Sequence, residues 1–223
     1  MKKKNCSLFL AIVFIISSFS AFASPVSAGA AQSVIISGQD VANGQSVDGV
    51  TFTAAEGEIP ATLTLETTTI QSDGDGGRGI QISGFADFRI VVSGENTINI
   101  GGHGSIGILM EGGNLTIYGD ESTDNLNITS ETGIRMDGWG DPRTLTFTGF
   151  VTADISNLFL EPVGTEARFE DDVNVTLHQS ESDLTGRFTE TDSAIVTFDD
   201  PGGDPPAQSV IISGQDVANG QSV

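Results

Sequence analysis

The feature that most constrains the fold is a diffuse internal repeat with a period of about 28. Its clearest mark is a glycine followed by Ile-x-Ile or Ile-x-Met, which begins at Gly79, Gly107 and Gly133, with offsets of 107 − 79 = 28 and 133 − 107 = 26. Further apolar pairs follow each mark, again spaced i, i+2, which is the period of a β-strand that buries one face. Glycine, asparagine, aspartate and serine fill the intervals and indicate tight turns.

Three short strands per repeat at one period are typical of a parallel β-helix. A single coil buries too little apolar surface to be stable, but stacked coils share a continuous core. We therefore predict an all-β solenoid of five or six coils with three short strands per coil, and a β-sandwich is the alternative. The second pairs align as Ile90/Val92, Leu115/Ile117, Leu145/Phe147 and Val173/Val175, and the third as Ile98/Ile100 and Leu126/Ile128.

A second repeat is exact. Residues 31–47 recur unchanged as residues 207–223, an offset of 207 − 31 = 176. Glycine and proline in residues 201–206 indicate a linker, which leaves residues 29–200 as the β-helix domain. Three explanations stay open for the second copy: the start of the next unit of a tandem array cut off at this point, a donor strand that replaces the first copy by strand addition, or an engineered duplication.

Residues 1–28 have the features of a secretory signal peptide. A basic start of three lysines precedes an uncharged apolar stretch and the small-x-small site Val26-Ser27-Ala28. The three lysines and Cys6 are the only lysines and the only cysteine, so the mature chain from about Gly29 has six arginines and all 30 acidic residues, 6 − 30 = −24. We expect a bacterial protein that is secreted or held at the cell surface.

The mature composition excludes several classes of function. A charge of −24 repels nucleic acid and anionic membrane surfaces. Without cysteine no disulfide forms, so a hydrophobic core must supply the stability. Only the leader approaches the length of a membrane span, so we do not expect an integral membrane protein.

Three segments carry a resemblance to a known family: Ile-Gln-Ile-Ser-Gly at 80–84, Gly-Asn-Leu-Thr-Ile-Tyr-Gly at 113–119 and Glu-Thr-Gly-Ile-Arg-Met-Asp-Gly at 131–138. They resemble secreted bacterial right-handed β-helix surface proteins of the pectate-lyase-like superfamily, in particular the carbohydrate-binding domains. The resemblance is close across residues 79–138 and loose over most of the remaining domain. It implies a right-handed parallel β-helix that meets glycans or forms part of a surface, and it supplies no substrate.

His103 raises the enzyme alternative, because residues 102–104 resemble the Gly-His-Gly stretch of polygalacturonases. That family also has an Asn-Thr-Asp and an Asp-Asp motif before the histidine and an Arg-Ile-Lys after it. Here the Asp-Asp pairs at 171–172 and 199–200 follow His103, and the mature chain has no lysine. Inverting hydrolysis needs an acid and a base that flank the bond. We therefore predict no catalytic residue and a non-enzymatic protein, with a polysaccharide lyase or hydrolase as the alternative.

Acidic residues suggest a calcium site. Asp73 and Asp75 begin a stretch like a carboxylate-rich calcium loop, although the third oxygen ligand is missing. Glu111, Asp137 and the pair at 170–171 recur after the first strand of their repeats, where stacking would bring like charges together. Asp73, Asp75, Glu111 and Asp137 are therefore the candidate ligands, calcium is the candidate cofactor, and a solvated acidic face is the alternative.

Aromatic residues near glycines suggest a sugar site. Trp139 lies between Asp137 and Asp141, and Phe85 occupies a comparable corner of an earlier coil. Exposed aromatic side chains in one corner would form a platform for a sugar ring, and local packing of Trp139 over the coil is the alternative. We take Trp139, Phe85, Asp137 and Asp141 as candidate ligand-binding residues.

These observations predict an exported structural or adhesive module that is one unit of a tandem array. Its expected partner is an extracellular glycan or a surface protein. The alternatives are the carbohydrate-active enzyme and a filament subunit that self-associates through residues 31–47 and 207–223.

Overall fold

The computed structural model describes residues 31–199, except for residues 48, 139–140, 162–163, 185 and the side chain of residue 182, together with the backbone of residues 210–212 and 215–217. The predicted signal peptide, the linker and Trp139 lie outside the described residues. The described part of the chain contains no helix long and apolar enough to cross a membrane.

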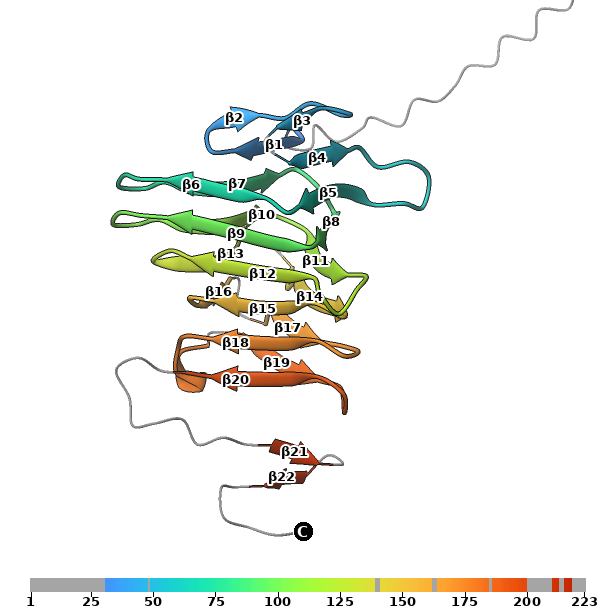
Figure 1. Ribbon diagram of the computed structural model, residues 1–223, viewed down its shortest axis with the longest axis vertical. Coiled ribbons are helices and arrows are strands. Elements are labelled where there is room, and N and C mark those ends of the chain that lie inside the picture. Colours follow the sequence, from blue (N-terminus) through green and yellow to red (C-terminus); the bar gives the residue numbers. More distant parts are fainter. Residues whose placement is uncertain are drawn as a thin grey trace, which may run out of the picture.

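Three sheets run along the molecule (Figure 1). Sheet 1 has the order β16 (Leu158–Leu160), β13 (Thr132–Asp137), β10 (Ile106–Glu111), β7 (Arg78–Ser83), β1 (Ser33–Ile36) and β2 (Gln39–Asp40). Sheet 2 has the order β19 (Arg187–Glu190), β17 (Glu166–Phe169), β14 (Thr144–Gly149), β11 (Asn114–Gly119), β8 (Asp87–Ser93), β5 (Ala61–Glu66), β4 (Val50–Thr53) and β3 (Ser46–Val47). Sheet 3 has the order β20 (Ile195–Phe198), β18 (Asn174–Leu177), β15 (Thr152–Ile155), β12 (Asn125–Thr129), β9 (Glu95–Ile100) and β6 (Thr69–Ser72).

The chain visits sheets 2, 3 and 1 in turn, and strands of successive coils pair in parallel. This arrangement confirms the predicted parallel β-solenoid. Four coils contain all three strands, from β5–β6–β7 to β14–β15–β16. The next two coils have no described strand in sheet 1, and in the first of them the chain after β18 forms the short 3₁₀ helix η1 (Glu181–Asp183) instead. Three strands per coil therefore holds for four coils of the predicted five or six.

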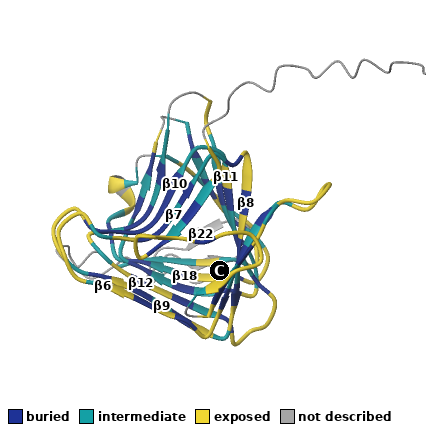
Figure 2. Ribbon diagram, turned by 90° about the horizontal axis from the view of Figure 1, so that it is seen from above, coloured by how far each residue is buried: buried dark blue, intermediate teal, exposed yellow. Residues whose placement is uncertain are grey.

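Inward-facing apolar side chains form continuous columns through the solenoid, and Figure 2 shows the buried residues along its inner walls. Ile80 pairs with Ile108, and Ile108 pairs with Ile134, as the sequence predicts. The close approach of successive coils requires the glycine before each of these residues. A Cβ atom on Gly79 would lie 2.6 Å from the carbonyl oxygen of Gly107, so the coils approach too closely for any side chain there.

The predicted register of the other two sheets is correct only in part. Leu115 and Ile117 lie opposite Leu145 and Phe147, as predicted, but the step from the preceding coil is wrong. Ile90 lies opposite Ile117 rather than Leu115, and Ile98 lies opposite Ile128 rather than Leu126. Sheet 2 continues through residues 167 and 169, whereas Val175 belongs to sheet 3. The reason is that turns differ in length between coils. For sheet 2, three residues separate β7 from β8 but two separate β10 from β11; for sheet 3, one separates β8 from β9 but five separate β11 from β12. One fixed sequence offset therefore cannot give the correct residue pairs in all three sheets.

The two ends of the solenoid differ. At the N-terminal end, β1 and β4 lie antiparallel on β7 and β5, and their inward residues, such as Val34 and Val50, are buried. At the C-terminal end, β19 and β20 form the last coil, and their apolar residues Phe188, Val196 and Phe198 are only partly buried. The N-terminal end therefore has a cap of antiparallel strands that covers the core.

The exact repeat forms the same hairpin twice. β1 pairs with β2 so that Ile36 lies opposite Gln39. β21 (Val210–Ile212) pairs with β22 (Gln215–Val217) so that Ile212 lies opposite Gln215, which is the register of the first copy at the offset 212 − 36 = 176. The two-residue turn of the first copy, Ser37 and Gly38, has φ of 47° and 80°, as a type I′ hairpin requires.

We predict that Ile108→Asp prevents the solenoid from folding. Ile108 is fully buried between Ile80 and Ile134, so the substitution places an unpaired carboxylate in the core at a cost of several kcal/mol. Circular dichroism should show loss of the β-sheet signal or a large fall in melting temperature. Asn127→Asp, at an exposed position of β12, should change the melting temperature by far less.

Candidate functional site

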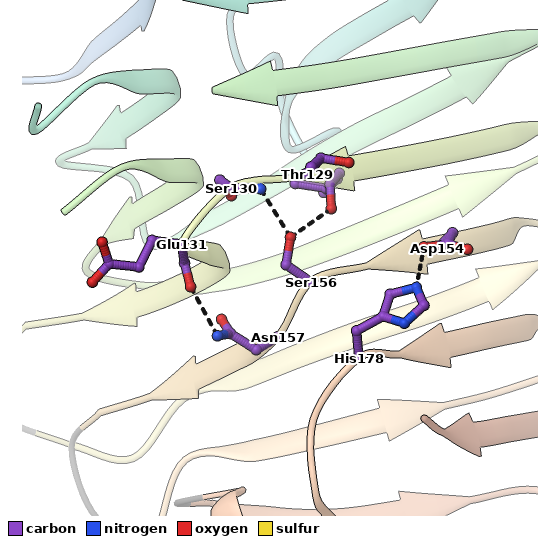
Figure 3. Close-up of a pocket in the computed structure, with 8 residues that line it drawn as sticks. Thr129, Ser130, Glu131, Asp154, Ser156, Asn157 and His178 are labelled. Carbon is purple, nitrogen blue, oxygen red and sulfur yellow. Dashed lines mark hydrogen bonds and ion pairs between the residues drawn. The ribbon is translucent and has the colours of Figure 1, made fainter. Parts of the chain in front are cut away.

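A shallow polar groove lies along the edge where sheet 3 turns into sheet 1. It has a volume of about 460 Å³ and is formed by the turns that follow β12, β15 and β18 in three successive coils. Figure 3 shows its lining side chains. The lining residues are Ile128, Thr129, Ser130, Glu131, Asp154, Ser156, Asn157 and His178.

Two of the lining side chains bind backbone groups of the neighbouring coil. The Ser156 hydroxyl accepts a hydrogen bond from the Ser130 N–H and donates one to the Ile128 carbonyl, both at 2.9 Å (Figure 3). The Asn157 side chain donates to the Glu131 carbonyl at 2.9 Å and accepts from the Gly133 N–H at 3.1 Å. These residues hold successive turns in register, which leaves the carboxylates and the imidazole as the reactive groups of the groove.

His178 lies between two carboxylates from different coils. Its Nε2 is 2.7 Å from an oxygen of Asp154, and its Nδ1 is 3.3 Å from an oxygen of Asp199. A neutral imidazole has one N–H donor, so only the imidazolium donates to both acids. The two carboxylates face opposite ring nitrogens and therefore do not converge on one point, as ligands of a single metal ion would.

His103 lies at the same edge, in the coil before Glu131. Its Nδ1 is 2.9 Å from Glu131, and its backbone N–H donates to Asp75 at 3.0 Å. The side chain of His103 is 90% exposed, so its imidazole is solvated. The structure thus brings the sequence candidates Asp75 and His103 together with Glu131 of the groove. Each carboxylate contacts a different atom of His103, and no arrangement of paired acids around the ring is seen among the described contacts.

The four predicted calcium ligands occupy two separate places. Glu111 and Asp137 lie opposite one another at the C-terminal ends of β10 and β13, as predicted. Asp73 and Asp75 precede β7 and therefore lie at the opposite edge of sheet 1. The pair at 170–171 follows β17 of sheet 2, and Glu161 continues the Glu111–Asp137 column instead. The described residues contain no group of three metal-ligating side chains that could hold an ion.

Glu111 is stabilised as a carboxylate by neutral donors. The Ser83 hydroxyl and the Gln81 amide each donate to it at 2.7 Å. The Ser83 hydrogen bond, helped by Gln81 and by Arg78, lowers the pKa of Glu111 against a smaller opposing effect of burial. Asp137 is held differently, by an ion pair with Arg135 at 3.1 Å. The two stacked acids therefore have partners of their own.

The predicted aromatic platform is wrong for Phe85. Its side chain is 6% exposed and packs against Phe88 and Phe52, with ring centroids 4.9 and 6.0 Å away. The cap strand β4 supplies Phe52, and this long-range contact draws Phe85 inward. Asp141 is exposed and Asp137 is half-buried, while Trp139 lies outside the described residues.

Sequence reasoning missed Asp154, His178 and Asp199. They come from three coils at the unequal spacings 178 − 154 = 24 and 199 − 178 = 21, so no fixed period connects them. The signal in the sequence is that each polar residue lies within or just after an apolar i, i+2 pair of sheet 3. Only the true register of that sheet brings the three together.

Comparisons of the chain with known protein families, with curated proteins and with solved structures found no match.

We predict that Glu111→Gln destabilises the protein at neutral pH and that the difference shrinks in acid. Because the folded-state pKa lies below the ordinary value of 4.5, the carboxylate stabilises the fold above that value. The stabilisation is lost as pH falls below 4.5 through the folded-state pKa. Urea unfolding of the wild type and the variant between pH 7 and pH 3 checks this.

Ser83→Ala serves as the matched control, because it removes the main donor and leaves the carboxylate in place. It should reproduce much of the destabilisation at pH 7. An unchanged difference between wild type and Glu111→Gln from pH 7 to pH 3 would contradict the prediction.

Proposed function

We propose that this chain is an exported structural and adhesive module of a cell surface or the extracellular space, and one unit of a tandem array. The observation that supports the repeated unit is the hairpin formed twice in one register, at β1–β2 and at β21–β22. The first copy forms the cap with which the solenoid begins. A second copy that forms the same hairpin therefore supports the beginning of a second unit.

Export is supported by sequence features. Residues 1–28 combine a basic start, an apolar stretch and a small-x-small site. The mature chain has no cysteine and a charge of −24, which suits a protein that stays solvated outside the cell. The likeness of residues 79–138 to pectate-lyase-like surface proteins of bacteria adds to this proposal.

A non-enzymatic role is favoured by the chemistry of the groove. The imidazole of His103 contacts one carboxylate, that of Glu131, and Ser156 and Asn157 are engaged by backbone groups. The groove that contains Glu131, Asp154 and His178 is nevertheless the place where a polysaccharide-cleaving activity would be sought, since it holds acids and an imidazole side by side.

Glycan binding is the second candidate function, and the polar groove favours it. The carboxylates of Glu131 and Asp154 and the imidazole of His178 come from three stacked coils, so they form a row along the solenoid. Such a row suits an extended polyol chain, because successive sugar hydroxyls would meet successive coils. The acidic lining selects neutral or cationic sugars over anionic ones.

Export is tested by producing the full chain in a bacterium and measuring the mass of the secreted or surface protein. For the wild type we expect a product that begins at about Gly29. The matched control, Ala28→Arg, should keep its leader and stay in the cell. Release of unprocessed protein, or equal processing of the variant, would contradict the assigned cleavage site.

Glycan binding is tested by pull-down with insoluble neutral, cationic and anionic polysaccharides. We expect retention on neutral or cationic polymers and a loss of at least fivefold in Glu131→Gln/Asp154→Asn, with an unchanged melting temperature for Glu131→Gln alone. The matched control is Glu58→Gln, far from the groove. Release of reducing ends or unsaturated sugars would instead establish the enzyme alternative.

A further inference from the structure

The first copy of the repeat binds one defined edge of the solenoid. β1 lies antiparallel on β7, with Val34 opposite Ile82 and Ile36 opposite Ile80. The Ser37 N–H donates to the Gly79 carbonyl at 2.9 Å, which extends the ladder beyond the strand. Val34 and Ile36 are 1% and 3% exposed, so this contact both pairs the β7 edge and covers the core.

The hairpin is encoded by its own residues rather than by the solenoid. The positive φ angles at Ser37 and Gly38 set the turn, and the Val41 N–H donates to the Val34 carbonyl at 2.8 Å. The second copy has the same sequence and forms the same hairpin. Within the described part of the chain, β21 pairs with β22 alone, and the edge that corresponds to the β7-binding edge of β1 has no strand beside it.

We propose that residues 207–223 are a second cap, which binds the β7 edge of another copy of this chain in place of that copy's residues 31–47. In this contact Val210 lies opposite Ile82, Ile211 opposite Gln81 and Ile212 opposite Ile80. Each pair follows from the observed β1–β7 register and the offset between the two copies, 207 − 31 = 176. The inference goes beyond the proposed function and depends on neither export nor adhesion. For residues 207–223 it is the alternative to the tandem array, in which they would cap the coils of the unit that they begin.

Geometry favours a second chain over the same chain as the acceptor. The position of β1 lies six strand spacings from β20, about 29 Å along the axis, and about 20 Å across sheet 1 from its end. The straight-line distance is therefore about 35 Å, while the eleven residue steps from Asp199 to Val210 reach about 36–40 Å when fully extended. Docking within one chain would need a nearly taut connection around the solenoid, whereas docking between chains has no such restriction.

The proposed contact joins unlike surfaces, the tail of one chain and the head of the next. Such a heterologous contact does not close on itself in general, so chains would add head to tail. Because the two copies are identical, exchange gains no contact energy, and the resident copy has the advantage of its high effective concentration. Exchange in the wild type is therefore expected at high protein concentration, and it becomes dominant when the resident copy is disabled.

The first experiment disables each copy in the mature full chain and measures oligomer mass by light scattering across a range of concentrations. Val34→Asp/Ile36→Asp frees the β7 edge, and we expect concentration-dependent oligomers. Adding Val210→Asp/Ile212→Asp to this variant should restore monomers, because both caps are then disabled. Oligomers that persist in the fourfold variant, or a monomeric Val34→Asp/Ile36→Asp variant, would overturn the proposal.

The second experiment keeps both caps and traps the contact with cysteines, which the mature chain lacks. Under oxidation, Gln81→Cys/Ile211→Cys should give a ladder of linked chains on a non-reducing gel, increasing with protein concentration. The matched control, Gln81→Cys/Ile35→Cys, should link within one chain and stay monomeric, since Ile35 lies opposite Gln81. The single variant Gln81→Cys can link at most two chains. If Gln81→Cys/Ile211→Cys also gives nothing larger than a dimer, the proposal is overturned.

Discussion

The structure depends on how closely the backbones of successive coils approach one another in sheet 1. A Cβ atom on Gly79, Gly107 or Gly133 would lie 2.6–2.7 Å from a carbonyl oxygen of the next coil. The absence of side chains there lets the parallel ladders continue and keeps the Ile80 column in line with its neighbours. The columns in turn bury the apolar pairs that no single coil could shield from water.

Much of the fold was accessible from the sequence, because strand alternation and the glycine marks are local features. Sheet 1 follows its predicted register, since its strands are marked by those glycines. The predicted register is wrong between the second and third coils of sheets 2 and 3. In sheet 2 the turn before β11 is shorter than the one before β8, and in sheet 3 the turn between β11 and β12 is longer than the one between β8 and β9. The register of each strand depends on the lengths of all the turns that precede it. A diffuse repeat in the sequence gives only the average length of those turns.

The site was harder to predict than the fold. Glu111 and Asp137 could be paired because they follow marked strands, but Asp154, His178 and Asp199 meet only in the true register of sheet 3. Phe85 showed the opposite error, because a residue between turn-forming neighbours is drawn inward by Phe52 of the distant cap. The local sequence indicates where turns lie, but it does not indicate which side chains are buried by contacts with distant segments.

The locally encoded hairpin also bears on the order of folding. The parallel pairs join positions that are close in the chain, with separations from 187 − 166 = 21 to 125 − 95 = 30, so no contact between coils requires closure of a long loop. A chain that emerges from its N-terminus can form the turn at Ser37 and Gly38 first, then lay each coil on the one before. The cap would then act as a template, and the direction of synthesis would coincide with the direction of growth of the core.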